Sequence, residues 1–127
     1  MLALGVDTSN YATSLAVVDT SGWEVVCALK RFLPVKSGEL GLRQSDAVFH
    51  HTTALPVMVQ ELAGLCDLTK VKAVGVSQRP RGEDGSCMPL FLAGVNFASA
   101  FAAAGGSKLV LTSHQQGHLA AALYGAD

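Results

Sequence analysis

The sequence has few charged side chains and lacks the basic excess of most nucleic-acid-binding domains. Only 15% of its 127 residues are charged, and 9 basic against 10 acidic side chains give a formal net charge of −1. A domain that binds RNA unaided normally carries a basic stripe. The composition therefore argues against unaided RNA binding, and any RNA contact would need other parts of an assembly.

Long apolar runs and closely spaced cysteines are also missing. No run approaches the ~18 apolar residues of a membrane-spanning helix, and the first residues, 1–6, lack a basic leader before Asp7 interrupts them. Cys27, Cys66 and Cys87 are an odd number at wide spacings, which favours neither a disulfide framework nor a zinc ribbon. We expect a reduced, cytoplasmic protein without membrane contact.

Hydrophobic residues, in contrast, make up 50% of the sequence, enough to build the core of one domain. Residues 2–8, 12–19 and 23–32 are short apolar segments separated by turn-forming residues, which predicts an antiparallel meander of three strands. Beyond them the pattern alternates between helix and strand. We expect helices over 46–65, 88–104 and 113–123, and strands over 71–77 and 109–112.

The predicted order of elements is βββαβαβα. Such an order predicts a mixed sheet with helices packed on it, the arrangement of ribonuclease H-like and actin-like ATPase lobes. Pro56 lies inside the first expected helix, where proline is expected to kink or restart it. The expected class is therefore α/β, with a single lobe over residues 1–127.

Two histidines form the sharpest chemical motif of the sequence. His114 and His118 are four residues apart, so on a helix they project from one face and can share a metal ion. Solvated surface histidines are the alternative, but Gly117 between them costs about 1 kcal/mol in a helix and calls for a reason. Gln115 stands where a zinc peptidase has its general base, which argues against peptide hydrolysis.

An anion-binding turn is predicted near the start of the chain. Asp7, Thr8 and Ser9 follow the first apolar segment, and the backbone amides and hydroxyls of such a turn can bind phosphate. An ordinary hairpin turn is the alternative.

These motifs resemble the glycoprotease family, whose TsaD-type members are tRNA threonylcarbamoyladenosine transferases. The family's metal signature reads His, Leu or Gln, Glu, Gly, His, Leu and small residues, and residues 114–121 read His-Gln-Gln-Gly-His-Leu-Ala-Ala. Residues 5–9, Gly-Val-Asp-Thr-Ser, resemble the family's Gly-Ile-Glu-Thr-Ser, and residues 51–56 resemble its His-x-x-x-Leu-Pro helix. The motifs occur in the family's order over nearly all of the chain.

Two further sites follow from this resemblance. His51 either lines the cleft or is a partly buried histidine with backbone partners. Where the family has a Gly-Pro-Gly loop, this chain has Gln78-Arg79-Pro80-Arg81. Arg79 or Arg81 then either holds phosphate or an acidic partner, or belongs to a solvated loop.

The resemblance implies the amino-terminal lobe of a longer two-lobe protein, inactive by itself. In that parent, a divalent metal, iron or zinc, on His114 and His118 would orient the donor, and ATP or an adenylate would be the ligand. The third metal ligand would come from the other lobe. A homologous or identical lobe is the expected dimer partner, and tRNA would bind only through the full-length protein and partner subunits. A non-catalytic paralogue, and more weakly a metallopeptidase or small ATPase, are the alternatives.

Overall fold

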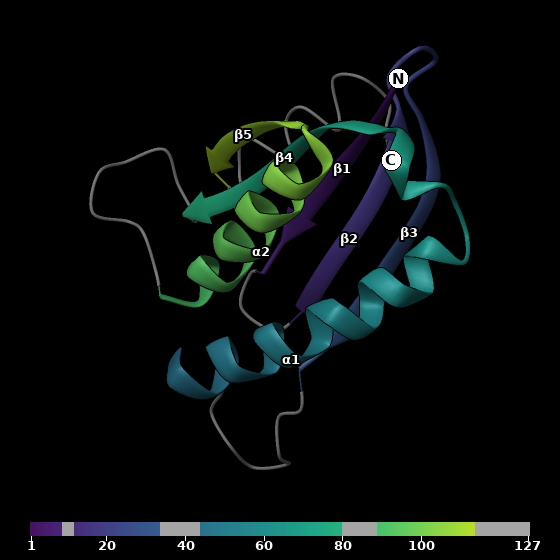
Figure 1. The fold of residues 1–127 in the computed structure, drawn as a ribbon. Coiled ribbons are helices and arrows are strands. Elements are labelled where there is room, and N and C mark those ends of the chain that lie inside the picture. The colour runs from purple at the N-terminus through teal and green to yellow at the C-terminus, as the bar shows by residue number, and fades with distance from the viewer. Residues whose placement is uncertain (9–11, 34–43, 80–88, 114–127) are drawn as a thin grey trace.

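The computed structural model describes residues 1–8, 12–33, 44–79 and 89–113 (Figure 1). Its helices and strands in chain order are β1 (Leu2–Asp7), β2 (Ala12–Asp19), β3 (Glu24–Phe32), α1 (Gln44–Ala63), the short 3-10 helix η1 (Leu68–Lys70), β4 (Val71–Arg79), α2 (Pro89–Gly105) and β5 (Lys108–Ser113).

The strands form one mixed sheet in the order β3-β2-β1-β4-β5. β1, β2 and β3 form the predicted antiparallel meander, with Val6 opposite Leu15 and Leu15 opposite Leu29. β4 pairs with β1 and β5 in parallel, with Val76 opposite both Val6 and Leu111. Three neighbouring strands, β1, β4 and β5, therefore end at the same edge of the sheet.

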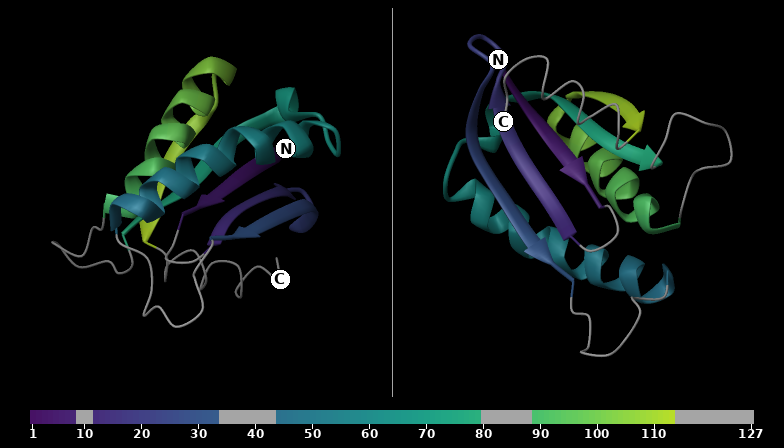
Figure 2. Two further views of the ribbon diagram at one scale, coloured as in Figure 1. Left: turned by 90° about the horizontal axis from the view of Figure 1, so that it is seen from below. Right: turned by 180° about the vertical axis from the view of Figure 1, so that it is seen from behind.

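Both long helices cover one face of this sheet, as Figure 2 shows from below. α1 contacts β2 and β3, whereas α2 contacts β4, β1 and β5, and the two helices also contact each other. α2 thus packs on the two strands that it connects, β4 and β5, and on β1, whereas α1 packs on β3, which precedes it, and on β2.

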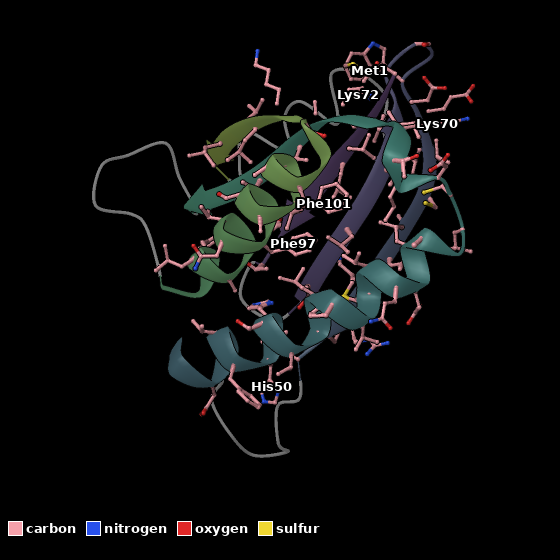
Figure 3. All side chains as sticks on the ribbon, in the orientation of Figure 1. Met1, His50, Lys70, Lys72, Phe97 and Phe101 are labelled. Atoms are coloured by element: carbon pink, nitrogen blue, oxygen red, sulfur yellow. The ribbon has the colours of Figure 1, made fainter. Side chains whose placement is uncertain are left out.

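The main core lies between the helices and the sheet. In β2, alternate residues are buried, as expected for a strand with one face toward the core. Phe97 and Phe101, labelled in Figure 3, project from α2 onto this core with ring centroids 5.9 Å apart. The fully packed apolar residues are Leu4, Val6, Leu15, Val17, Leu55, Met58, Leu62, Val71, Val74, Val76, Ala98 and Ala102.

The predicted order is found for every element up to β5, and the predicted helix over 113–123 falls almost entirely outside the described residues.

The expected restart at Pro56 is wrong, because α1 continues through this residue as one helix. Pro56 and Thr52, whose carbonyl loses its helical partner, are both exposed, so water can satisfy that carbonyl. Among the described residues, no helix is long and apolar enough to cross a membrane.

Candidate site at the carboxyl edge of the sheet

The carboxyl ends of β1, β4 and β5 lie side by side, and antiparallel pairing brings the start of β2 and the end of β3 to the same place. We call this row the carboxyl edge. It carries Asp7 and Thr8 from the end of β1, Thr13 from the start of β2, and Ser113 from the end of β5. In open α/β sheets, ligands bind outside the carboxyl ends of the strands.

Buried polar residues gather at this edge. Within the described part of the chain they are Thr8, Thr13, His51 and Ser77, whereas the rest of the core is apolar. Burying a polar group costs free energy unless it is hydrogen-bonded. Their concentration at one edge therefore makes this edge the best candidate for a functional site.

Thr8 fixes α2 to the end of β1. The backbone N–H of Gly94 donates a hydrogen bond to Thr8 Oγ1 over 3.2 Å, and the Thr8 side chain is fully buried. A Cβ on Gly94 would lie 2.8 Å from Thr8 Oγ1 and 3.2 Å from its Cγ2. The close approach of helix and strand thus requires glycine at position 94.

Replacing Gly94 with alanine is therefore expected to lower the free energy of unfolding. The clash with a short, buried side chain costs about 1–3 kcal/mol, against a gain of about 1 kcal/mol in helix propensity. We expect a net loss of up to about 2 kcal/mol, measured by urea unfolding. Gly105→Ala is the matched control, because among the described residues the nearest atom to its Cβ would be Ser107 Oγ, at an ordinary contact distance of 3.6 Å. A Gly94→Ala variant as stable as the control would contradict the close packing.

His51 joins α1 to the start of β2. Its Nδ1 and Thr13 Oγ1 are 2.7 Å apart, in a buried hydrogen bond, and neither side chain is exposed to solvent. Which atom donates depends on the histidine tautomer. The alternative predicted for His51 was a partly buried histidine with backbone partners, whereas the structure buries the side chain fully and gives it the Thr13 side chain as one partner. A role in lining a cleft stays a prediction.

A pocket of about 170 Å³ opens beside this hydrogen bond, between β2, β3 and α1. The Arg31 guanidinium at its rim donates to Glu61 Oε1 over 3.0 Å, so its charge is already balanced. The polar groups that the pocket presents to a ligand are therefore the hydroxyls of Thr13 and Thr53 and the imidazole of His50, because the Arg31 cation is already paired. Its lining residues are Thr13, Arg31, Phe32, Leu33, His50, Thr53 and Ala54.

Of the predicted site residues, Asp7 and Thr8 lie at the carboxyl edge, and Arg79 is the last residue of β4, paired with Ser113. Ser9 and Arg81 lie outside the described residues.

The predicted metal ligands His114 and His118 also lie outside the described residues. Among the residues that are described, no group of three or more His, Cys, Asp or Glu could hold a metal ion. The metal site therefore stays a prediction that rests on the sequence motif.

Sequence reasoning missed the partners that complete the edge. Thr13 and Gly94 carry no motif of their own, and the hydrogen bond of Gly94 to Thr8 spans 86 positions. A glycine inside an Ala-rich helix was the available signal, since glycine there usually marks a close approach.

No protein-family model and no curated protein matches the sequence. The structure is similar to YeaZ from Pseudomonas aeruginosa, with a TM-score of 0.56 and 20% identity over 89% of this chain and 43% of that one. An uncharacterized protein with similarity to peptidase YeaZ, also from Pseudomonas aeruginosa, gives a TM-score of 0.54 and 21% identity over 88% of this chain and 43% of that one. RuvC from T. thermophilus, solved with a Holliday junction substrate, gives a TM-score of 0.53 and 12% identity over 91% of this chain and 66% of that one.

These similarities define the class of protein at the level of fold: a mixed α/β sheet of the ribonuclease H-like, actin-like ATPase type, as predicted. Within that class, the two YeaZ-type structures share the fold of this chain. The chain spans less than half the length of the two YeaZ-type structures.

Proposed function

We propose that the chain is the amino-terminal lobe of a longer protein of the glycoprotease family that takes part in transferring a threonylcarbamoyl group to an adenosine of tRNA. Three observations support this proposal: the ordered motifs of the sequence, the similarity to YeaZ, and the gathering of buried polar residues at the carboxyl edge. Because the chain has no basic excess, tRNA would be held by the rest of the protein and its partners.

The observation that carries the proposal is the parallel arrangement of β1, β4 and β5. Neighbouring strands are about 4.8 Å apart, so the ends of β1 and β5 are separated by about 10 Å. Asp7 stands at the end of β1, and His114 follows Ser113, the last residue of β5, in the sequence. The end of β1, which carries the opening motif, and the end of β5, after which the histidine motif follows in the sequence, are therefore close enough for one ligand to span.

The residues divide into supporting and ligand-facing groups in this proposal. Thr8 uses its buried hydroxyl oxygen to hold α2, and Thr13 with His51 holds α1. These bonds fix the edge before any ligand binds, which lowers the cost of ordering a site. His114 and His118 would be the metal ligands of this lobe, and a metal there would supply Lewis-acid polarisation and a template for the donor.

The test is reconstitution with the full-length protein, its partner subunits, tRNA and threonylcarbamoyl-adenylate. Modified adenosine is measured by mass spectrometry and bound metal by elemental analysis. We expect His114→Ala and His118→Ala each to reduce metal content and modification by about tenfold or more, because metal sites lose at least that much even when a supporting partner is removed. His50→Ala, outside the motif, is the control. No modified adenosine with the native protein would contradict the proposal.

A non-catalytic subunit of the same fold is the second candidate. It is favoured by the replacement of the family's Gly-Pro-Gly loop by Gln78-Arg79-Pro80-Arg81, since arginine side chains obstruct a place where glycine lets the backbone approach a ligand. The same reconstitution separates the two candidates. If the chain belongs to a scaffold subunit, adenosine modification requires the protein but continues when both His114 and His118 are replaced.

A further inference from the structure

Two cysteines that are far apart in the sequence meet beside the core. Cys27 lies in β3 and Cys66 follows the end of α1, and their Sγ atoms are 3.4 Å apart. Both side chains are partly buried and pack against the main core. The backbone is held at both cysteines. Cys27 is paired with Val17 of β2, and the N–H of Cys66 donates to the carbonyl of Leu62 over 3.1 Å.

The two thiols are also linked by hydrogen bonds. The Cys27 thiol donates to Cys66 Sγ, and the Cys66 thiol lies 3.7 Å from the carbonyl oxygen of Leu62 as a weak donor. Burial, followed by the contact with Cys27, raises the pKa of the Cys66 thiol to about 11. Because the thiolate is the nucleophile in disulfide exchange, Cys66 reacts slowly at neutral pH. The two thiols are therefore held close together, with Cys66 in its protonated form at neutral pH.

We propose that Cys27 and Cys66 form a reversible intramolecular disulfide when the protein meets a low-molecular-mass disulfide oxidant. The S–S bond is about 2.05 Å long, so the two sulfur atoms need to approach by only about 1.4 Å from their separation of 3.4 Å. Rotation of two side chains on fixed backbones supplies a movement of that size. The geometry thus marks a modification site independent of the carboxyl edge.

The chemistry balances in two exchange steps. The Cys27 thiolate attacks one sulfur of the oxidant, and the departing small thiolate takes up a proton. The Cys66 thiolate then attacks Cys27 Sγ and expels the second small thiol. Two protein thiols are oxidised to one disulfide while one small disulfide is reduced to two thiols, and excess small thiol reverses the reaction.

The expected physical effect is to anchor the edge of the sheet. β3 is an edge strand and exposes Val25 and Val26 to solvent, a combination that invites pairing with other chains. A bond from Cys27 to Cys66 ties this strand to the end of α1 and closes a loop of 40 residues, counted from one cysteine to the other. Such a loop restricts the unfolded chain and stabilises the folded one.

The experiment is equilibration of the protein in mixtures of oxidised and reduced glutathione, followed by thiol blocking and peptide mapping without reduction. We expect one crosslinked peptide pair, Cys27 with Cys66, and a Tm raised by roughly 5–15 °C, both reversed by dithiothreitol. Cys87→Ser should keep the crosslink and Cys66→Ser should lose it, with folding of each variant checked by circular dichroism.

Crosslinks of either cysteine to Cys87 or to a second molecule would overturn the proposal. So would persistent free thiols, or glutathione mixed disulfides without the internal bond. Neither result depends on tRNA modification, so the two proposals fail separately.

Discussion

Replacing Phe91 with alanine is expected to lower the free energy of unfolding by about 3–5 kcal/mol, the usual cost of deleting a buried phenylalanine. The Phe91 ring is 1% exposed and packs with Leu33 and Ala47 in a second, smaller apolar cluster. These residues come from the first turns of α2 and α1 and from the position after β3. The ring therefore holds both helix starts beside the carboxyl edge, and its loss leaves a cavity there.

Leu92→Ala provides the matched control for this prediction. Leu92 is the next residue of α2 and is 49% exposed, so its truncation should change the free energy of unfolding by about 1 kcal/mol or less. Urea unfolding monitored by circular dichroism measures both variants. Equal effects of the two substitutions would show that the second cluster does not hold the helices.

Replacing His51 with alanine should cost about 3 kcal/mol. The side chain is fully buried, so its removal leaves a cavity and also takes away the hydrogen-bond partner of buried Thr13. Both losses destabilise the folded state, the first through missing contacts and the second through an unsatisfied hydroxyl. Thermal unfolding should show the change as a drop of roughly 10 °C in Tm.

His50→Ala is the control beside it. His50 lies at the pocket, away from the core, with its ring edge-on to that of Phe49 at a centroid distance of 5.4 Å (Figure 3). Its loss should lower Tm by only a few degrees. Equal drops in Tm for His50→Ala and His51→Ala would show that the buried hydrogen bond between His51 and Thr13 does not contribute more to stability than an ordinary surface contact.

The fold follows from the sequence where the pattern is strongly periodic. The short apolar segment of β2 between turn-forming residues, and the Ala-rich composition of α2, allowed both to be predicted close to their observed bounds. The interior of α1 was harder to predict, because Pro56 suggested a kink or a restart, whereas the helix continues through this exposed residue. The sequence shows that proline removes a helical hydrogen bond, but it does not show whether water replaces that bond.

The site was less predictable than the fold. Asp7 and Thr8 were singled out by a motif and do lie at the carboxyl edge. Their neighbours Thr13 and Gly94 meet them only through strand pairing and helix packing. The approach of Cys27 to Cys66 has the same origin, since β3 and the end of α1 adjoin only in the folded sheet. Apart from the glycine inside α2, these contacts between distant positions leave no local signature in the sequence.

The central claim is that this chain belongs to a protein that serves threonylcarbamoyl modification of tRNA. The most direct measurement is the amount of threonylcarbamoyladenosine in tRNA from cells in which the gene encoding the chain is deleted, and from the same cells with the gene restored. We expect the modified nucleoside to fall strongly on deletion and to return on restoration. An unchanged amount in the deleted cells would contradict the proposed function and leave only the shared fold.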